Sequence, residues 1–407
     1  MNKMEIADGV YMLTMNVEDI LFEGIWKIEN GVTLNSYIVQ GEKTAIIDGM
    51  IGWDGIPETL YRNFKEIGIE PQNVDYLIVN HMEPDHSGWI SNFRKVKDNF
   101  TVICTEKAAK MVTSFYGEDK IRIVKEGDTL DLGKGKVLSF HPVPNVHWPD
   151  TMYTYEINTK TLFSCDMFGA FGRMGDHSFD DELTPEEIDF FECEGIRYYS
   201  NVMTTFTPSL KKAIEKAKML QINTIAPGHG PVYRKNPQKI IDDYSRYSRY
   251  AEGAGKNEVT ILWGSMYGMT AKALDYAENI LQREGVKYNK LQMPLVSESE
   301  MIATVFKSAG IIIAAPTYEY KLFPPVAAAL NEIGRKKITG KTAFRFGSYG
   351  WSGGAEKELK EIIERNKMNW DFIESVEFEG APKEEDLVKV EARILELIEK
   401  MKEKVVV

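Results

Sequence analysis

Four side chains that commonly bind metal ions lie together in the segment 79–86, whose sequence is VNHMEPDH. They are His81, Glu83, Asp85 and His86, and they directly follow the apolar run Tyr76–Val79, which predicts a strand. Imidazole and carboxylate groups are ligands for transition metals. Alternate positions of an extended segment point the same way, and Pro84 disfavours a helix. We therefore expect an extended metal-binding loop at the end of a strand.

Three further candidate ligands follow predicted strands later in the chain. His147 lies in the loop PNVHWP, Asp166 follows the apolar run Leu162–Cys165, and His229 lies in APGHGP. The glycines of the last loop let the backbone fold close to a ligand. Because an α/β scaffold presents its functional side chains at strand-to-loop junctions, we expect all seven residues to converge on one metal centre.

For the other histidines and for two aromatic residues near these loops, we expect roles other than metal binding. The chain has six histidines, and His141 and His177 have no neighbouring ligand pattern, so we expect structural or exposed roles for them. His177 could alternatively line a substrate pocket. Tyr198 and Trp148 are candidates for contacts behind the metal ligands, although aromatic residues at such positions more often serve packing.

A second kind of site is predicted after residue 257. The loop 263–270, WGSMYGMT, follows an apolar strand and precedes a helix. Its hydroxyls, its amides and the helix N-terminus can bind a phosphate group without a basic side chain. Neither G-x-x-x-x-G-K-[ST] nor G-x-G-x-x-G is present, which argues against a nucleoside triphosphate or a dinucleotide.

Two later strand ends carry aromatic and glycine-rich loops, APTYEY at 315–320 and GSYGWSGG at 347–354. A flat isoalloxazine ring needs planar neighbours and close backbone donors at the carboxyl ends of parallel strands. These loops therefore predict an FMN site. The expected contacts are Ser265, Met266, Tyr267, Gly268, Met269, Thr270, Pro316, Thr317, Tyr318, Tyr320, Ser348, Tyr349, Gly350, Trp351 and Gly353.

The elements that must position these residues fall into two patterns. Residues 1–250 contain short strands, several in consecutive pairs, with helices between them, and they predict mixed sheets with helices outside. Residues 258–407 alternate strand and helix, which predicts a parallel, doubly wound sheet. The segment 251–257, AEGAGKN, is the expected linker.

Bulk composition excludes several function classes. The chain has 407 residues and a net charge of −12, which disfavours nucleic acid and anionic lipid as partners. Glu5 and Asp8 interrupt any apolar signal segment, and no run has membrane-spanning length, so we expect a cytoplasmic protein. The three widely spaced cysteines argue against disulfides and predict reduced, mostly buried thiols.

The pattern H-x-[EH]-x-D-H, followed by a single histidine, a single aspartate and Gly-His, resembles the metallo-β-lactamase fold over about residues 1–250. Hydrolases of that fold usually have histidine where this chain has Glu83, a difference that resembles the flavodiiron proteins, also called A-type flavoproteins. The loop at 263–270 is similar to the flavodoxin phosphate loop, but Tyr267 stands where threonine is usual. The resemblance thus covers nearly the whole chain.

The resemblance implies an α/β chain with an N-terminal αββα sandwich and a C-terminal flavodoxin-like domain. It implies one iron ion held by His81, Glu83 and His147, a second held by Asp85, His86 and His229, and Asp166 bridging the two. No catalytic residue beyond these ligands is implied. Three carboxylates around two cations also suit iron that must reach the ferric state.

The implied function is reduction of dioxygen to water, of nitric oxide to nitrous oxide, or of both, with FMN returning electrons to the iron ions. The resemblance also implies a head-to-tail homodimer, or a dimer of such dimers, and a separate rubredoxin-like electron donor. Two alternatives are a zinc hydrolase with a flavodoxin-like accessory domain and an electron-transfer flavoprotein with a structural metal site. Glu83 argues against the first, and the full set of seven candidate ligands against the second.

Overall fold

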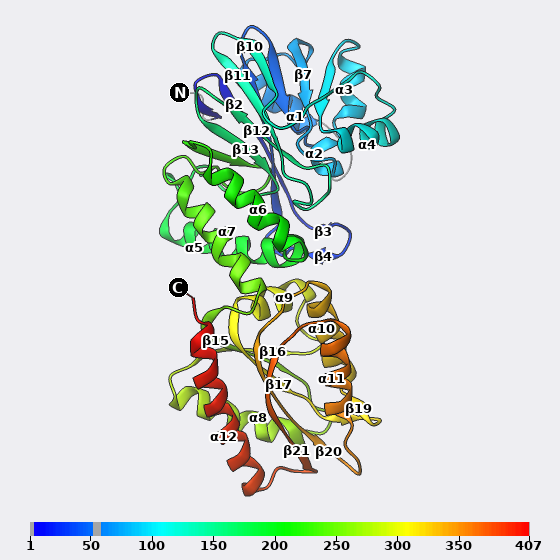
Figure 1. The fold of residues 1–407 in the computed structure, drawn as a ribbon, viewed down its shortest axis with the longest axis vertical. Helices are drawn as coiled ribbons and strands as arrows, with labels where there is room; N and C mark the ends of the chain where they lie inside the picture. The colour runs from blue at the N-terminus through cyan, green and yellow to red at the C-terminus, as the bar shows by residue number, and fades with distance from the viewer. Residues whose placement is uncertain (1–3, 52–57, 407) are drawn as a thin grey trace. The chain divides into compact units, whose positions relative to one another are not determined.

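The computed structural model describes residues 4–51 and 58–406 (Figure 1). The chain forms two compact units, one made of Met1–Tyr199 with Phe206–Ser245 and the other of Ser200–Thr205 with Arg246–Val407. The chain passes from the first unit to the second within helix α7, Pro237–Ala251. Ala251 therefore ends a helix and Lys256 begins a strand, so only 252–255 of the expected linker lie outside these two elements.

The first unit contains a mixed seven-stranded sheet. Its strands are paired antiparallel from β1 to β6 and parallel from β6 to β9. In spatial order they are β1 (Glu5–Ala7), β2 (Val10–Val17), β5 (Val32–Gln40), β6 (Thr44–Ile47), β7 (Val74–Ile78), β8 (Thr101–Cys104) and β9 (Ile121–Ile123). A short hairpin, β3 (Leu21–Phe22) with β4 (Trp26–Lys27), interrupts the chain between β2 and β5.

A five-stranded sheet packs against it. The spatial order is β10 (Thr129–Gly133), β11 (Lys136–Pro142), β12 (Met152–Glu156), β13 (Thr161–Cys165) and β14 (Thr224–Pro227). One buried apolar cluster takes Tyr37 and Ile78 from the larger sheet and Phe140 and Phe163 from the smaller one, so the two sheets face each other across a shared core.

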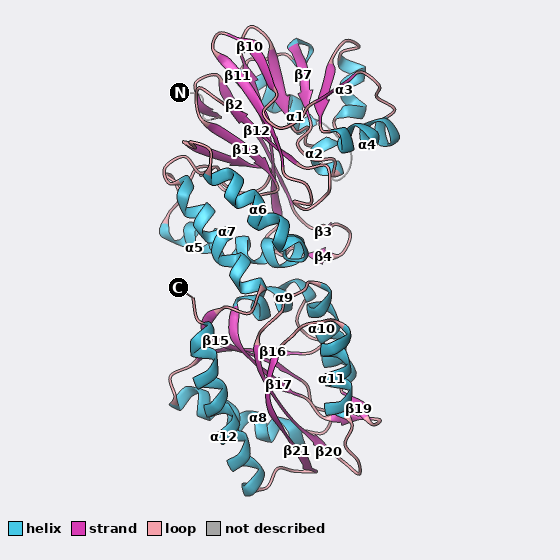
Figure 2. Cartoon of the chain, viewed as in Figure 1, coloured by secondary structure: helices cyan, strands magenta, loops and turns pink. Residues whose placement is uncertain are grey.

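Helices flank the two sheets of this unit. Figure 2 shows α1, α3 and α4 gathered beside strands of the first sheet, and α5, α6 and α7 gathered beside β13. The bounds are α1 (Glu58–Ile67), α2 (Pro84–Ser87), α3 (Ile90–Val96), α4 (Glu106–Tyr116), α5 (Pro185–Tyr198) and α6 (Thr207–Lys218). The predicted αββα sandwich is confirmed. The sequence pattern of residues 56–67 also predicts a helix; residues 58–67 form α1, and residues 56–57 lie outside the described ranges.

Local sequence explains where these helices begin and end. Thr184 caps α5 by accepting a hydrogen bond from the Glu187 amide, and the Glu187 carboxylate bonds back to the Thr184 amide. The Thr105 hydroxyl caps α4 by accepting a hydrogen bond from the Ala108 amide, and that helix ends at Gly117, whose φ of 66° is easily adopted only by glycine.

The second unit is a parallel sheet covered by helices on both faces. Its spatial order is β16 (Lys287–Gln292), β15 (Lys256–Trp263), β17 (Ser308–Ala314), β20 (Thr342–Tyr349) and β21 (Asp371–Glu379). Figure 2 shows helices α8 (Met269–Arg283) and α12 (Glu384–Met401) on one side of the sheet, and α10 (Pro324–Arg335) and α11 (Ala355–Arg365) on the other. The predicted doubly wound sheet is confirmed, with a strand order of flavodoxin type.

Sequence reasoning missed strand β16, helix α9 (Glu298–Lys307) and a short antiparallel hairpin, β18 (Thr317–Tyr318) with β19 (Lys321–Leu322). Strand β16, KYNKLQ, lies at the edge of the sheet and buries only Leu291. An edge strand needs little apolar surface, so its sequence carries no alternating pattern. None of the helices in the described ranges is long and apolar enough to cross a membrane.

Candidate functional site

The four clustered ligands follow strand β7, two of them in a loop and two in a short helix. His81 and Glu83 lie in the loop after the strand, whereas Asp85 and His86 lie in the short helix α2, which Pro84 begins. The expectation that Pro84 blocks a helix was wrong. Proline suits the first position of a helix because the amide there has no partner within the helix. Positions 81, 83 and 85 therefore do not face one way, and Asp85 turns toward a different set of side chains.

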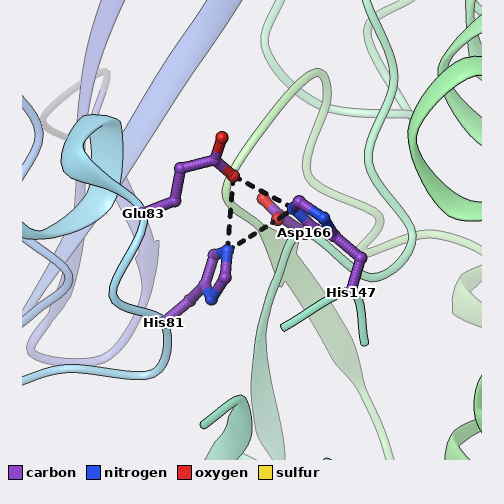
Figure 3. A group of neighbouring side chains, drawn as sticks. All are labelled: His81, Glu83, His147 and Asp166. Carbon is purple, nitrogen blue, oxygen red and sulfur yellow. Dashed lines mark hydrogen bonds and ion pairs between the residues drawn. The ribbon is translucent and has the colours of Figure 1, made fainter. Parts of the chain in front are cut away.

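The first set consists of His81, Glu83, His147 and Asp166 (Figure 3). Glu83 Oε2 lies 3.3 Å from His81 Nε2 and 3.0 Å from His147 Nε2. Asp166 Oδ2 lies 3.4 Å and 3.1 Å from the same two nitrogens. Four donor atoms from three separate segments of the chain thus surround one point.

The second set consists of Asp85, His86 and His229, joined by the other oxygen of Asp166. Asp166 Oδ1 lies 2.8 Å from His86 Nε2 and 3.3 Å from His229 Nε2. Asp85 Oδ2 lies 3.6 Å and 3.5 Å from these nitrogens. Asp166 therefore directs one carboxylate oxygen at each set, and the structure brings all seven predicted side chains together.

The donor atoms fit two cations. A metal with bonds of about 2.1 Å separates adjacent ligand atoms by roughly 3.0 to 3.4 Å, close to the distances in both sets. Both carboxylate oxygens of Asp85 and both of Asp166 are buried, and among the described residues only the imidazoles of the two sets, and no hydroxyl or backbone amide, lie where they could donate to these oxygens. Buried carboxylates without hydrogen-bond donors are costly unless a cation neutralises them.

The titration of these groups points the same way. Burial opposes ionisation, but the hydrogen bonds from His147 and His81 outweigh it and lower the pKa of Glu83 to about 2. Burial likewise disfavours the imidazolium of His86, but the charges of Asp85 and Asp166 outweigh it and raise the pKa of His86 to about 10. Positive charge therefore stabilises the three close carboxylates. Protons on the histidines provide that charge in the absence of metal ions.

Residues behind the ligands orient the imidazoles. His229 Nδ1 lies 3.0 Å from the Thr33 carbonyl oxygen. His81 Nδ1 lies 3.3 Å from Thr151 Oγ1 and 3.6 Å from Asp150 Oδ2. Such outer partners fix which ring nitrogen faces a metal.

Sequence reasoning missed these supporting residues. Asp150 carried a usable signal, because it follows the His147 loop directly, whereas Thr33 acts through its backbone and carried none. Asp48 is a further supporting residue that sequence reasoning missed. It directly follows strand β6, and its carboxylate accepts a hydrogen bond from the Asn80 amide at 2.8 Å. Burial raises the pKa of Asp48 to about 6.

The two aromatic candidates lie against the ligands. The Trp148 ring centre is 5.1 Å from that of His81, and the Tyr198 ring centre is 5.6 Å from that of His229. The Tyr198 hydroxyl is buried and has no hydrogen-bond partner among the described residues. Tyr198 and Trp148 therefore frame opposite sets of ligands.

The two remaining histidines make contacts away from the ligands. His177 Nδ1 lies 2.8 Å from Glu187 Oε2 at the start of α5, and His141 Nδ1 lies 2.7 Å from Glu126 Oε1. A cavity of about 710 Å³ opens beside Glu83 and Asp85, and His177 is not among its lining residues. The lining includes Phe115 and Tyr116, which sequence reasoning did not single out.

Three loops of the second unit meet around another cavity, of about 310 Å³. Eleven of the fifteen predicted FMN contacts line it: Met266, Tyr267, Met269, Pro316, Thr317, Tyr318, Tyr320, Ser348, Tyr349, Gly350 and Trp351. Glu319, Ser352 and Gly380 also line it and were missed. The first two continue predicted loops, whereas Gly380 follows the last strand, where no aromatic residue or hydroxyl marked the position.

The other four predicted contacts, Ser265, Gly268, Thr270 and Gly353, do not line the cavity. Two of them shape the phosphate loop. Ser265 Oγ accepts the Gly268 amide at 3.1 Å, and the fully buried Thr270 hydroxyl accepts the Ser348 amide at 3.2 Å. The cavity suits a flat aromatic ligand, because Tyr267, Tyr320 and Trp351 expose much of their rings. The buried Thr317 hydroxyl has no hydrogen-bond partner among the described residues.

Comparisons with known proteins agree with this geometry. A family described as ODP family beta lactamase matches residues 32–230. The chain is 31% identical to the anaerobic nitric oxide reductase flavorubredoxin of Shigella dysenteriae over 347 residues, 83% of this chain and 70% of that one. It is 29% identical to the nitric oxide reductase of Moorella thermoacetica over 388 residues, 94% of each chain.

A solved structure extends the likeness to the fold of the whole chain. The flavodiiron protein from Giardia intestinalis is 26% identical, with a TM-score of 0.86 over 98% of this chain and 97% of that one. The chain spans about two thirds of the length of the flavorubredoxins that it matches.

Proposed function

Because the chain belongs to the flavodiiron protein family, we propose that it reduces nitric oxide to nitrous oxide, dioxygen to water, or both. The observation that carries the proposal is the position of Asp166, whose two oxygens each face a separate set of ligand atoms. A carboxylate shared in this way suits two adjacent metal ions. The curated relatives are named as nitric oxide reductases, and we extend that activity to this chain.

The electron balance fits the two sites. Dioxygen takes four electrons and four protons to give two waters, whereas two nitric oxide molecules take two electrons and two protons to give nitrous oxide and one water. When bound, a reduced FMN would supply two electrons, and the pair of ferrous ions would supply two more, one from each ion. Glu83 and Asp85 line the cavity beside the ligand sets, so a small gas that enters there meets both sets.

The chain's own residues hold this centre rigidly. Thr33 and Thr151 with Asp150 fix the imidazoles of His229 and His81 from behind. His86 and Asp85 share the short helix α2, so neither can shift without the other. Rigid ligands favour rapid change of metal oxidation state because little reorganisation is needed.

Iron rather than zinc is proposed for both positions. Three carboxylates bring three negative charges to two cations, which stabilises the ferric state and weakens the Lewis acidity that zinc hydrolysis needs. The alternative of a zinc hydrolase is not favoured, because the matched relatives are reductases.

We also propose FMN as the ligand of the cavity in the second unit and a rubredoxin-like protein as the electron donor. The aromatic lining and the phosphate-loop geometry support FMN. As in the family resemblance, a head-to-tail homodimer, alone or paired into a dimer of dimers, would let the flavin of one copy serve the metal centre of the other. The mass of the particle in solution tests this assembly.

Purified protein tests the proposal directly. Metal analysis should find two iron ions per chain, and the optical spectrum should show oxidised flavin. After anaerobic reduction, stopped-flow mixing with nitric oxide and, separately, with dioxygen should reoxidise the protein. Zinc without flavin, or reduced protein that neither gas reoxidises, contradicts the proposal.

A further inference from the structure

A buried arginine lies below the cavity of the second unit. Arg345 is in the middle of strand β20, and its side chain is 0% exposed. Its Nη1 donates to Glu377 Oε1 at 2.6 Å, and its Nη2 donates to the Ala315 carbonyl oxygen at 3.1 Å. A guanidinium is expensive to bury, so a position that retains one needs what the planar, forked group provides.

The bond to Ala315 falls where the sheet opens. Strands β17 and β20 pair in register up to Ala314 and Phe346, and the Ala315 amide still donates to the Phe346 carbonyl. In a regular parallel ladder the next bond would run from the Ser348 amide to the Ala315 carbonyl. The Ser348 amide instead bonds to Thr270 Oγ1, in the helix that follows the phosphate loop.

Arg345 therefore satisfies a carbonyl that the separating strands leave without its ladder partner. Gly347 makes this possible, because a Cβ there would lie 1.8 Å from the Ala315 oxygen. The residues directly after Ala315, Pro316 to Tyr320, form one wall of the cavity.

The bond to Glu377 reaches a second wall. Glu377 lies on strand β21, and a Cβ built on Gly353 would lie 3.3 Å from its Oε2, so the carboxylate packs against the loop 350–354. Gly350, Trp351 and Ser352 of that loop line the cavity. One guanidinium thus connects the bases of two of the three loops that surround the cavity.

We propose that Arg345 is a positioning residue that holds the 316–320 and 350–354 loops at the spacing a bound flavin ring requires. The inference rests on the proposed FMN site. Arg345 does not line the cavity, so it acts through Ala315 and Glu377 rather than by touching the ligand. Preformed walls raise affinity because binding does not have to order them.

The test is a titration of the flavin-free protein with FMN. Quenching of the flavin fluorescence measures binding. Arg345→Met leaves both acceptors without their donor and should weaken FMN binding by roughly tenfold or more. Arg345→Lys reaches only one acceptor at a time, so its affinity should be intermediate. The visible circular dichroism of bound FMN should change in Arg345→Met, as a looser pocket requires.

Two further variants keep the test decisive. Lys341→Met is the matched control: Lys341 is another fully buried basic side chain, bonded to the carbonyls of Ala254 and Phe306, and it directly precedes strand β20, whose far end leads into the 350–354 loop. It should leave the FMN affinity of folded protein unchanged. Glu377→Ala removes the link to the 350–354 loop at a partly exposed side chain, and it should weaken FMN binding even if Arg345→Met does not fold.

The outcomes separate the inference from the proposed function. Wild-type protein that does not bind FMN contradicts the proposed function. Wild-type protein that binds FMN, with Arg345→Met or Glu377→Ala binding equally well, overturns the role of Arg345. An equal loss of affinity in Lys341→Met would trace the effect to general damage and also overturn it.

Discussion

His86 and His229 direct their Nε2 atoms at each other across 3.2 Å. The other nitrogen of His229, Nδ1, faces the Thr33 carbonyl, which only accepts hydrogen bonds, so Nδ1 must carry a hydrogen. In neutral His229 the lone pair therefore lies on Nε2 and faces His86 and Asp166. The fold thus fixes the tautomer that a metal ion needs before any ion arrives.

Replacing the shared carboxylate should abolish metal binding at both sets. Asp166→Asn keeps the shape but removes the charge that faces four imidazoles. We expect iron content to fall from two ions toward none, with metal affinity lowered more than about 100-fold. Elemental analysis of the purified variant measures this.

The matched control for that substitution is His177→Gln, since His177 is paired with Glu187 away from the ligands. It should retain two iron ions. An Asp166→Asn protein that keeps full iron content would show that the carboxylate does not hold the two ions together.

Loss of the Asp150 carboxylate behind His81 should lower metal affinity measurably, but less than loss of a ligand does. Asp150→Asn replaces a buried carboxylate that lies 3.6 Å from His81 Nδ1 with a neutral amide. Outer partners of this kind are typically worth about 10- to 100-fold in metal affinity. Competition with a chelator should therefore remove iron from the variant at lower chelator concentration. Asp131→Asn, at an exposed carboxylate that accepts the Gly133 amide, should behave as wild type.

The metal-free protein should lose stability as pH rises. Carboxylates outweigh burial and raise the pKa of His86 from 6.5 to about 10. A group whose folded-state pKa is raised contributes stability that is fully present below its unfolded pKa. That contribution is lost as pH rises from about 6.5 toward 10.

Urea unfolding at pH 6.5 and pH 9.5 checks this pH dependence. The unfolding midpoint of the metal-free protein should fall between the two, while the metal-loaded protein should change less, because its cations replace the protons. A metal-free protein that is equally stable at both values would mean that these imidazoles do not carry protons in the folded state.

The sequence predicted the fold where apolar patterns were strong. The buried strand β17, SAGIIIA, and the capped helix α5 are readable because burial and local hydrogen bonds act over a few residues. Strand β16 was missed because an edge position allows polar residues. The mistaken role of Pro84 has a similar origin: proline opposes a helix interior but favours a helix start, and only the tertiary fold decides which applies.

The ligand side chains were predictable because their chemistry is rare and their loops are local. Among the supporting residues, Asp150 could have been predicted from its place directly after the His147 loop. The Thr33 carbonyl could not, since it meets His229 across 196 residues of chain. The same limit applies in the second unit, where Thr270 was expected to contact phosphate but is fully buried and bonds to Ser348. The strand separation beside Arg345 produces that contact, and nothing in a linear sequence marks it.

Thr317 offers a direct test of the flavin cavity. Its hydroxyl is buried beside the cavity and has no hydrogen-bond partner among the described residues. Thr317→Val keeps the shape of the side chain and removes only the hydrogen-bonding group. If bound FMN uses that hydroxyl, affinity should fall by roughly tenfold, which is about 1.4 kcal/mol, while the stability of the flavin-free protein stays the same or rises slightly.

A second threonine provides the control for Thr317→Val. Thr342, at the start of strand β20, also has a buried hydroxyl without a described partner, but it does not line the cavity. Thr342→Val should therefore leave FMN affinity unchanged, as measured by fluorescence titration beside Thr317→Val. Equal affinities in both variants would place the flavin away from Thr317, because a buried hydroxyl that gains a partner on binding cannot be lost without cost.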